Sequence, residues 1–301
     1  MTASVDTLSA ATQERRRARR ENWRLLRRRP SFIIGSLISL FWIACAILGD
    51  HITPYDPLHY TTKPTLTPRS GHWFGTDKIG RDIFSRVIAG ARDVLLVAPA
   101  AAVLGVVFGA ILGMIMGYRR GWVDLLFSRV IEALLALPVI LIGLLILTLA
   151  DTSPLLGAIT FHSRKLLVIY IVALLFTPIV ARTVRSAVIG ERELDYVTSA
   201  KLRGESGVFI MSREILPNIM GPIIVALTVR IGYAIFTVST LSFLGVGIQR
   251  PSPDWGLAIS DGRDLLRANI WWPITFPALA IATLVVGVNL IADSIQSVYD
   301  R

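Results

Sequence analysis

Residues 94–117 read VLLVAPAAAVLGVVFGAILGMIMG, which is 24 consecutive residues without a charge. About 20 predominantly apolar residues are enough for a helix to cross the hydrocarbon core of a bilayer. The same run places Gly105, Gly109, Gly113 and Gly117 four residues apart, and therefore on one helix face. Small residues at this spacing let a second helix approach closely, because packing drives helix association in lipid. The run predicts a membrane-spanning helix with a tightly packed neighbour, and contact within this chain is favoured over contact with another subunit.

Five further segments share this apolar character. They are residues 31–49, 133–150, 166–181, 215–248 and 270–292. Over the whole chain of 301 residues, 53% are hydrophobic and only 17% are charged, whereas a soluble domain carries about a quarter charged residues. A disulfide-stapled secreted domain is excluded as well, because Cys45 is the only cysteine. The sequence therefore predicts an all-α integral membrane protein with six transmembrane helices.

The distribution of basic residues predicts the orientation, because loops with an excess of Lys and Arg stay in the cytoplasm. With the N-terminus inside, 19 of the 31 basic residues fall in cytoplasmic segments and 11 in external ones. Both termini are therefore expected in the cytoplasm, with the Arg-rich tail held at the anionic lipids of the inner leaflet. Removal of residues 31–49 as a signal peptide is the minority interpretation, since that run is longer than a usual signal core.

These segments divide the chain into four parts. They are a basic cytoplasmic tail at 1–30, a first transmembrane helix at 31–50, an external loop with an interfacial helix at 51–93, and a five-helix core at 94–301 that includes a cytoplasmic loop at 191–218. The net charge of +10 also suits a nucleic-acid partner. No nucleic acid is expected, because nothing else in the chain supports one.

No catalytic residue and no metal site is expected. The four histidines, His51, His59, His72 and His162, fall in external loops, where exposed histidines are the default, and none has a partner at metal-ligand spacing. Residues 75–82 have the glycine spacing of a phosphate-binding loop, but Arg and Asp stand where that loop needs Lys and Ser or Thr. The chain is therefore expected to be no enzyme and to bind no cofactor of its own.

Arg230 is the one charge deep inside a span. Charged side chains at membrane depth usually face a cavity or a partner. One interpretation is that Arg230 lines a pathway and meets an anionic group of a substrate. The other is that the span starts later and that the long side chain reaches back to the cytoplasmic interface. The sequence leaves these two interpretations at even odds.

The loop at 191–218 predicts two short helices around a turn. Glu191 and Glu193 favour the start of the first helix, and Gly204 allows the turn that ends it. Ser206 is expected to cap the second helix. Small residues at 198–200 permit close docking. The loop is therefore interpreted either as a compact knob that fits a partner's groove or as an ordinary amphipathic loop on the membrane.

The same loop resembles the coupling loop of ABC-importer permeases, which has the signature E-A-A…G…I-x-L-P. The positions that carry the resemblance are Asp195, Tyr196, Ala200, Gly204, Ile215, Leu216 and Pro217. Thr198 and Ser199 depart from it, because the family usually has Glu and Ala there. The resemblance implies that these nine residues couple the chain to an ATPase subunit, with Thr198 unable to form the ion pair of a carboxylate.

Further stretches resemble the C-type subunit of the dipeptide/oligopeptide/nickel permease family. They are residues 72–86, 121–124, 241–247, 253–256 and 261–264. This resemblance implies the type I ABC importer permease fold in a bacterial inner membrane. It also implies three kinds of partner: a homologous B-type permease, two ATP-binding subunits that hold ATP and magnesium, and an extracytoplasmic substrate-binding protein.

Short peptides are the implied substrate, with nickel, haem or another small solute as alternatives within the same importer class. A competing class is a secondary transporter driven by an ion gradient. Such transporters usually show inverted repeats and acidic residues paired inside their spans, and the sequence shows neither. Dependence on a separate ATPase distinguishes the two classes.

Overall fold

The computed structural model describes residues 26–60, 63–152 and 164–299. These residues form helices, and no extended β-strand is found among them. Five of the helices are long and apolar enough to cross a membrane. They are α2 (Pro30–Ile52), α3 (Ile83–Arg119), α7 (Arg164–Arg192), α11 (Met220–Phe243) and α13 (Trp272–Tyr299). The predicted class, an all-α membrane protein, is confirmed.

The third predicted span is a bent pair of helices rather than a straight one. α4 (Gly121–Leu135) and α5 (Val139–Thr152) meet at an angle of 90°. The single span predicted over residues 133–150 is therefore wrong in its course. Pro138 lies in the break, and proline lacks the amide hydrogen that would continue the helical ladder. The described residues hold five spans, or six if the bent pair counts as one.

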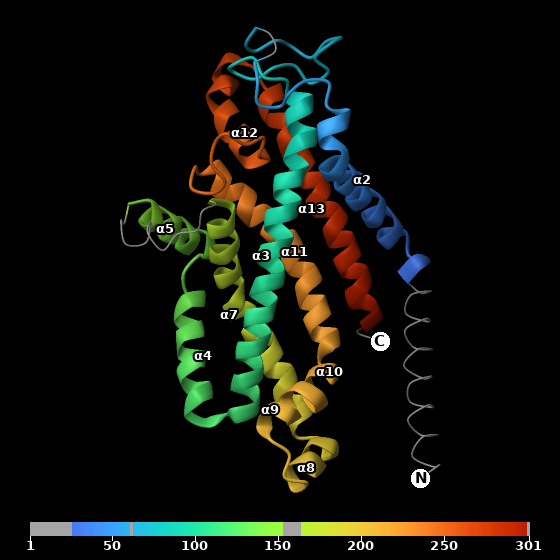
Figure 1. Ribbon diagram of the computed structural model, residues 1–301, viewed down its shortest axis with the longest axis vertical. Helices are drawn as coiled ribbons and strands as arrows, with labels where there is room; N and C mark the ends of the chain where they lie inside the picture. Colours follow the sequence, from blue (N-terminus) through green and yellow to red (C-terminus); the bar gives the residue numbers. More distant parts are fainter. Residues whose placement is uncertain (1–25, 61–62, 153–163, 300–301) are drawn as a thin grey trace.

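α3 and α7 form the centre of the bundle (Figure 1). α2 packs against α3 and α13, and α11 packs against α3, α7 and α13. The hydrophobic core lies between these helices. Its buried members include Ala91, Val94, Ala98, Val172, Phe176, Ala234, Val238 and Leu284.

Two helices extend beyond the spans that the sequence predicted. α3 begins at Ile83, where the side chain of Asp82 accepts a hydrogen bond from the Ser85 amide at 2.8 Å and caps the helix. The helix expected inside the external loop is therefore the first part of α3 and not a separate interfacial element. α7 likewise continues to Arg192, well past the predicted end at residue 181. Apolar runs stop at the first charge, whereas a helix continues as long as its backbone ladder is intact.

The two ends of the bundle carry different structures (Figure 1). At one end is a compact projection, which we call the knob. It consists of α8 (Asp195–Leu202), α9 (Gly207–Phe209), a π-helix (Ile210–Ile215) and α10 (Leu216–Asn218). At the other end, residues 63–82 and 244–271 form a cap, which includes α12 (Trp255–Gly262) and a 3-10 helix (Arg263–Ala268).

The first and last spanning helices lie side by side at the knob end. The hydroxyls of Ser31 and Ser294 are 3.0 Å apart and share a hydrogen bond, which joins the start of α2 to the last turns of α13. Arg29 donates a hydrogen bond to Ser297 one turn further along. The start of α2 and the end of α13 therefore lie on the same side of the bundle.

Candidate functional site

The knob begins with a break between two helices. α7 ends at Arg192, Leu194 has an extended backbone, and α8 starts at Asp195. The predicted helix start at Glu191 and Glu193 is therefore wrong. α7 continues through Glu191, and the acidic residue in the first turn of the new helix is Asp195.

The turn and the second cap of the knob are found where the sequence placed them. Gly204 has a φ of 78°, in the left-handed region that favours glycine. The amide of Glu205 donates back to the carbonyl of Ala200 at 3.2 Å, which closes the C-terminal turn of α8. The Ser206 hydroxyl accepts a hydrogen bond from the Phe209 amide at 3.3 Å and caps α9.

The knob has a small hydrophobic core of its own. Val197 and Ala200 of α8 are fully buried and pack with Ile210 and Ile215 of the π-helix and with Val188 of α7. Ala200 and Ile215, which the sequence assigned to contact with an ATPase, therefore face inward and hold the knob together. The small side chain of Ala200 lets α8 lie close to the π-helix.

The outer surface of the knob combines small polar and large apolar residues. Of the residues assigned by sequence, those exposed are Asp195, Thr198, Ser199, Gly204 and Pro217, while Tyr196 and Leu216 are half-buried. Beside them lie Leu202, 85% exposed, and Val208, 71% exposed. Sequence reasoning missed these two residues. The sequence feature that could have identified them is a large apolar side chain in a polar segment, at a position that does not contribute to the core.

Tyr196 links the knob to both neighbouring parts of the chain. Its hydroxyl donates to Glu191 at the end of α7, and Asn218 of α10 donates to the same hydroxyl at 3.0 Å. Burial and the Glu191 carboxylate raise the pKa of Tyr196 above its usual value. The side chain therefore stays a neutral hydrogen-bond bridge between α7, α8 and α10.

The four glycines of α3 lie against α7 in the same chain. A Cβ atom on Gly105 would lie 2.9 Å from the carbonyl oxygen of Ala173, and one on Gly113 would lie 2.4 Å from that of Ala181. Gly109 and Gly117 are equally crowded by α7. Only glycine allows the two backbones to approach this closely, so the seam between α3 and α7 depends on all four positions.

Arg230 lies near the middle of α11 and is half-buried. Its guanidinium carbon is 5.3 Å from the centre of the Tyr233 ring, within the range of a cation–π contact. The Nε atom is buried and has no hydrogen-bond partner among the described residues. α11 begins at Met220, so Arg230 is about 15 Å along the helix.

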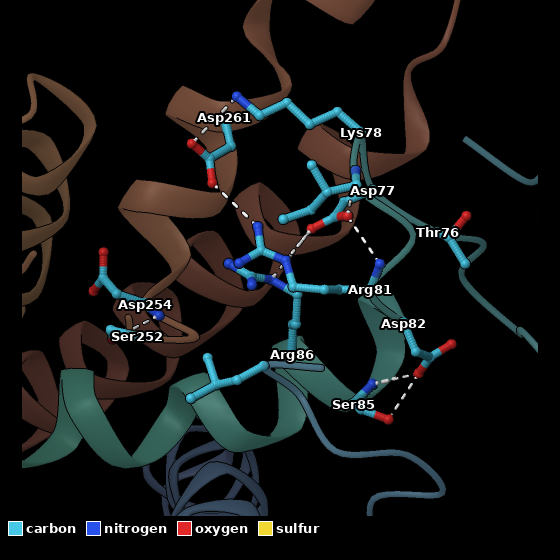
Figure 2. Close-up of polar contacts among 12 residues, drawn as sticks. Thr76, Asp77, Lys78, Arg81, Asp82, Ser85, Arg86, Ser252, Asp254 and Asp261 are labelled. Atoms are coloured by element: carbon cyan, nitrogen blue, oxygen red, sulfur yellow. Dashed lines mark hydrogen bonds and ion pairs between the residues drawn. The ribbon is translucent and has the colours of Figure 1, made fainter. Parts of the chain in front are cut away.

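The cap is closed by buried ion pairs (Figure 2). Arg81 donates through Nε to Asp77 at 2.7 Å and through Nη2 to Asp261 of α12 at 3.3 Å. Arg250 also donates to Asp261. Asp77, Arg81 and Asp261 are all buried. The cluster therefore ties the chain that precedes α3 to α12, which lies far away in the sequence.

Asp254 is a second buried carboxylate in the cap. Its Oδ1 accepts a hydrogen bond from the Leu257 amide at 2.9 Å and caps α12. The side chain is wholly buried, and this desolvation raises its pKa to about 6. The carboxyl group therefore keeps its proton to a higher pH than an exposed aspartate does.

The prediction that the four histidines are exposed in loops is wrong for His72. His72 is only 7% exposed, stacks on Tyr55 and lies 2.8 Å from the Asp82 carboxylate, so it belongs to the interior of the cap. His162 and most of the basic tail lie outside the described residues. In the part of the chain that the structure describes, no group of three or more His, Cys, Asp or Glu side chains is placed to hold a metal ion.

A bundle of apolar helices with a projecting, partly apolar knob is typical of the membrane subunit of a larger assembly. The comparisons with known families specify the kind of subunit. Residues 109–301 match the family of binding-protein-dependent transport system inner membrane components. Residues 18–68 match the N-terminal transmembrane domain of oligopeptide transport permease C. The chain therefore belongs to the family of binding-protein-dependent transport permeases, and the resemblance inferred from its motifs is confirmed.

Relatives match over nearly the whole chain. The dipeptide transport system permease protein DppC of Bacillus subtilis is 36% identical over 92% of this chain and 84% of its own length. A putative peptide transport system permease protein of Brucella suis is 38% identical over 92% and 90%. The glutathione transport system permease protein GsiD of Pectobacterium atrosepticum is 34% identical over 93% and 90%. The chain is thus a permease subunit of an ABC importer.

Proposed function

We propose that this chain forms half of the translocation pathway of an importer for short peptides and couples that pathway to ATPase subunits. The knob is the single observation that carries the proposal. Leu202 and Val208 expose large apolar surface outside the spanning helices, next to the small residues Thr198 and Ser199. Exposed apolar area of this kind marks a site of protein interaction.

The proposed assembly contains a homologous B-type permease, two ATP-binding subunits and an extracytoplasmic substrate-binding protein. ATP and magnesium belong to the ATP-binding subunits, and this chain makes or breaks no bond of its own. The knob and both termini lie in the cytoplasm in this arrangement, as the basic residues of the loops favour. The cap then faces outward, toward the binding protein.

Coupling follows from the way in which the knob is attached. An ATPase subunit shifts the pathway only if it contacts the knob differently before and after ATP binding. The core residues Val197 and Ile215 join the knob to α7, and Tyr196 joins it to α7 and α10. A displacement of the knob therefore moves the end of α7 and the start of α11, which adjoin it. Thr198 replaces the usual Glu, so docking here rests on shape and apolar contact.

Peptides are the proposed substrates because permease proteins of dipeptide and glutathione transport systems match this chain over nearly its whole length. Dipeptides and glutathione share a peptide backbone and at least one free carboxylate. Nickel, haem or another small solute remains the alternative within the same importer class.

The test is purification of the tagged chain from its native membrane in mild detergent, with Leu202→Glu as the variant. Leu266→Glu is the matched control, because Leu266 is an equally apolar residue that is 52% exposed in the cap. We expect the wild-type chain and the control to bring down a second permease and the ATP-binding subunits. Leu202→Glu should keep the permease partner and lose the ATPases. Recovery of the wild-type chain alone would contradict the proposal.

A further inference from the structure

Arg230 is a charge that no carboxylate among the described residues neutralises. Among the described residues, no carboxylate lies within ion-pair distance of it, and its buried Nε has no hydrogen-bond acceptor. Its guanidinium lies over the Tyr233 ring, with 5.3 Å between the guanidinium carbon and the ring centre. Other arginines of the bundle are different: Arg81 pairs with two carboxylates, and Arg185 of α7 pairs with Asp124 of α4 at 2.7 Å. A half-buried cation at membrane depth is costly without a counter-charge, and none of the described residues supplies one.

Arg230 lies at the edge of the face of α11 that looks away from the bundle. Tyr233 and Phe236, one and two turns further along, are 57% and 54% exposed. The opposite face, with Ala234 and Ile235, is fully buried in the core. The outward face continues into a groove lined by Phe236, Thr240 and Phe243 of α11 and by Ala278, Ile281 and Val285 of α13. The guanidinium therefore lies beside an open surface that runs along the span toward the cap.

The depth of Arg230 restricts what can neutralise it. It is about 15 Å from the first residue of α11 and about 20 Å from the last. Because the hydrocarbon core of a bilayer is about 30 Å thick, phospholipid phosphates lie at the ends of the helix and not at this level. Two sources of negative charge can reach this depth. One is a solute that moves along the outward face of α11, and the other is a side chain of a neighbouring subunit.

We propose that Arg230 and Tyr233 form a carboxylate-binding station inside the pathway, which holds the C-terminal carboxylate of a peptide during its passage. The inference rests on the function proposed above and assigns the chemical group that is recognised. A guanidinium offers a planar pair of donors that match the two oxygens of a carboxylate. The exposed Tyr233 ring holds the guanidinium from one side. Every linear peptide carries this carboxylate whatever its side chains are, so one arginine serves substrates of varied sequence.

Binding at this station also offsets the free-energy cost of placing a charge at mid-membrane depth. A substrate that brings a negative charge to mid-membrane depth is itself costly there. Arg230 and the carboxylate neutralise each other when they meet, so passage lowers the cost of both charges. Release needs the contact to be weak, and a single half-buried ion pair is weaker than a fully buried one.

The first experiment reconstitutes the complete importer, with its binding protein, into proteoliposomes and measures ATP-driven peptide uptake. The variants are Arg230→Gln and Arg230→Lys. Arg129→Gln is the control, because Arg129 is exposed on α4 and pairs with Glu132 in the same helix. We expect Arg230→Gln to lower uptake at least tenfold, Arg230→Lys to recover part of it, and the control to match the wild type. ATP hydrolysis stimulated by the loaded binding protein should match the wild type in the control.

The second experiment asks which end of the peptide reaches the site. In a Cys45→Ser background, Phe236→Cys is placed beside Tyr233. With copper phenanthroline added as the oxidant, disulfide formation is followed with a tripeptide that carries cysteine at its C-terminus or its N-terminus. We expect faster cross-linking with the C-terminal cysteine, and loss of that preference when Arg230→Gln is added.

Three results would overturn the inference. One is normal uptake by Arg230→Gln. Another is loss of the permease partner from Arg230→Gln during purification, which would make the partner's carboxylate the counter-charge. The third is equal cross-linking of the two tripeptides. Failure of the proposed function itself is visible separately, because the wild-type complex would then show no ATP-driven uptake of peptide.

Discussion

The knob and the cap hold their shapes by different means. The cap buries its charges against one another: Arg81 lies between Asp77 and Asp261, and all three are shielded from solvent. The knob has only a small apolar core, and it leaves Leu202 and Val208 uncovered. The cap is therefore held together by buried ion pairs, whereas the knob is held together by a small apolar core and presents two large apolar side chains at its surface. Under the proposed function, the cap fixes the external ends of the spans and the knob receives the contact with an ATPase subunit.

Arg81→Met should have the largest effect, because it breaks the cap. Removal of one partner from a buried ion pair costs about 3–5 kcal/mol. We expect little folded protein in the membrane, measured as the monodisperse fraction in size-exclusion chromatography. Arg129→Met is the control, because its ion pair with Glu132 is exposed and contributes less than about 1 kcal/mol. Equal yields of the two variants would show that the cap does not depend on its ion pairs.

The Asp254 carboxyl predicts a dependence of the cap's stability on pH. Burial raises its pKa from about 4 in an unfolded chain to about 6 in the fold. The folded protein therefore holds the proton more tightly, and stability falls as pH rises through this window. Acidification from pH 7 to pH 5 should recover about 1 kcal/mol, measured as a higher Tm in detergent. Asp254→Asn keeps a capping side chain and should show a weaker response. An identical pH profile in both proteins would exclude Asp254 as the source.

Gly204→Val tests the shape of the knob without touching its core. Among the described residues, no atom apart from those of Gly204 and its two chain neighbours lies within 4 Å of the position where a Cβ would be added, so the substitution causes backbone strain and no clash. A side chain in the left-handed region costs about 1–2 kcal/mol. We expect peptide uptake in proteoliposomes to be abolished while assembly stays largely intact. Gly204→Asn should retain uptake, because Asn tolerates this conformation. Normal uptake by Gly204→Val would remove the turn from the coupling contact.

Tyr196→Phe is the mildest change, since it removes one hydroxyl and leaves the ring in place. The lost hydrogen bonds to Glu191 and Asn218 contribute about 1 kcal/mol to the attachment of the knob. Uptake should fall several-fold while stimulated ATP hydrolysis continues, so the ratio of peptide transported to ATP hydrolysed decreases. Tyr60→Phe, on an exposed residue of the cap end, serves as the control. A parallel fall in hydrolysis and uptake would instead indicate a docking role for Tyr196.

The sequence predicted best those features that depend on neighbours along the chain. Apolar runs located the spans, and the residues of the knob's turn and second cap, Gly204 and Ser206, were found in their expected roles because a turn is decided by a few consecutive residues. The glycine spacing in α3 indicated a close neighbour because four positions on one helix face can be counted directly.

The features that the sequence did not predict depend on residues brought together by the fold. The pairing of Arg81 with Asp261 joins residues 180 positions apart. The inward orientation of Ala200 depends on the π-helix that packs over it. The bend at Pro138 was not predicted, because an apolar run indicates the length of a span and not its direction. For Arg230, the described residues supply the Tyr233 ring and no carboxylate, so neither the sequence nor the fold of this chain identifies its counter-charge.

The glycine seam has a mechanical consequence. With 37 residues, α3 is about 55 Å long, so it reaches from the cap past the far side of a bilayer core. α7 is fastened to it along four consecutive turns, and two rods joined at backbone contact bend much less easily than either rod alone. The pair therefore acts as a stiff lever. A displacement of the helix pair at the knob end therefore tilts both helices together and moves their ends at the cap, with little loss through bending.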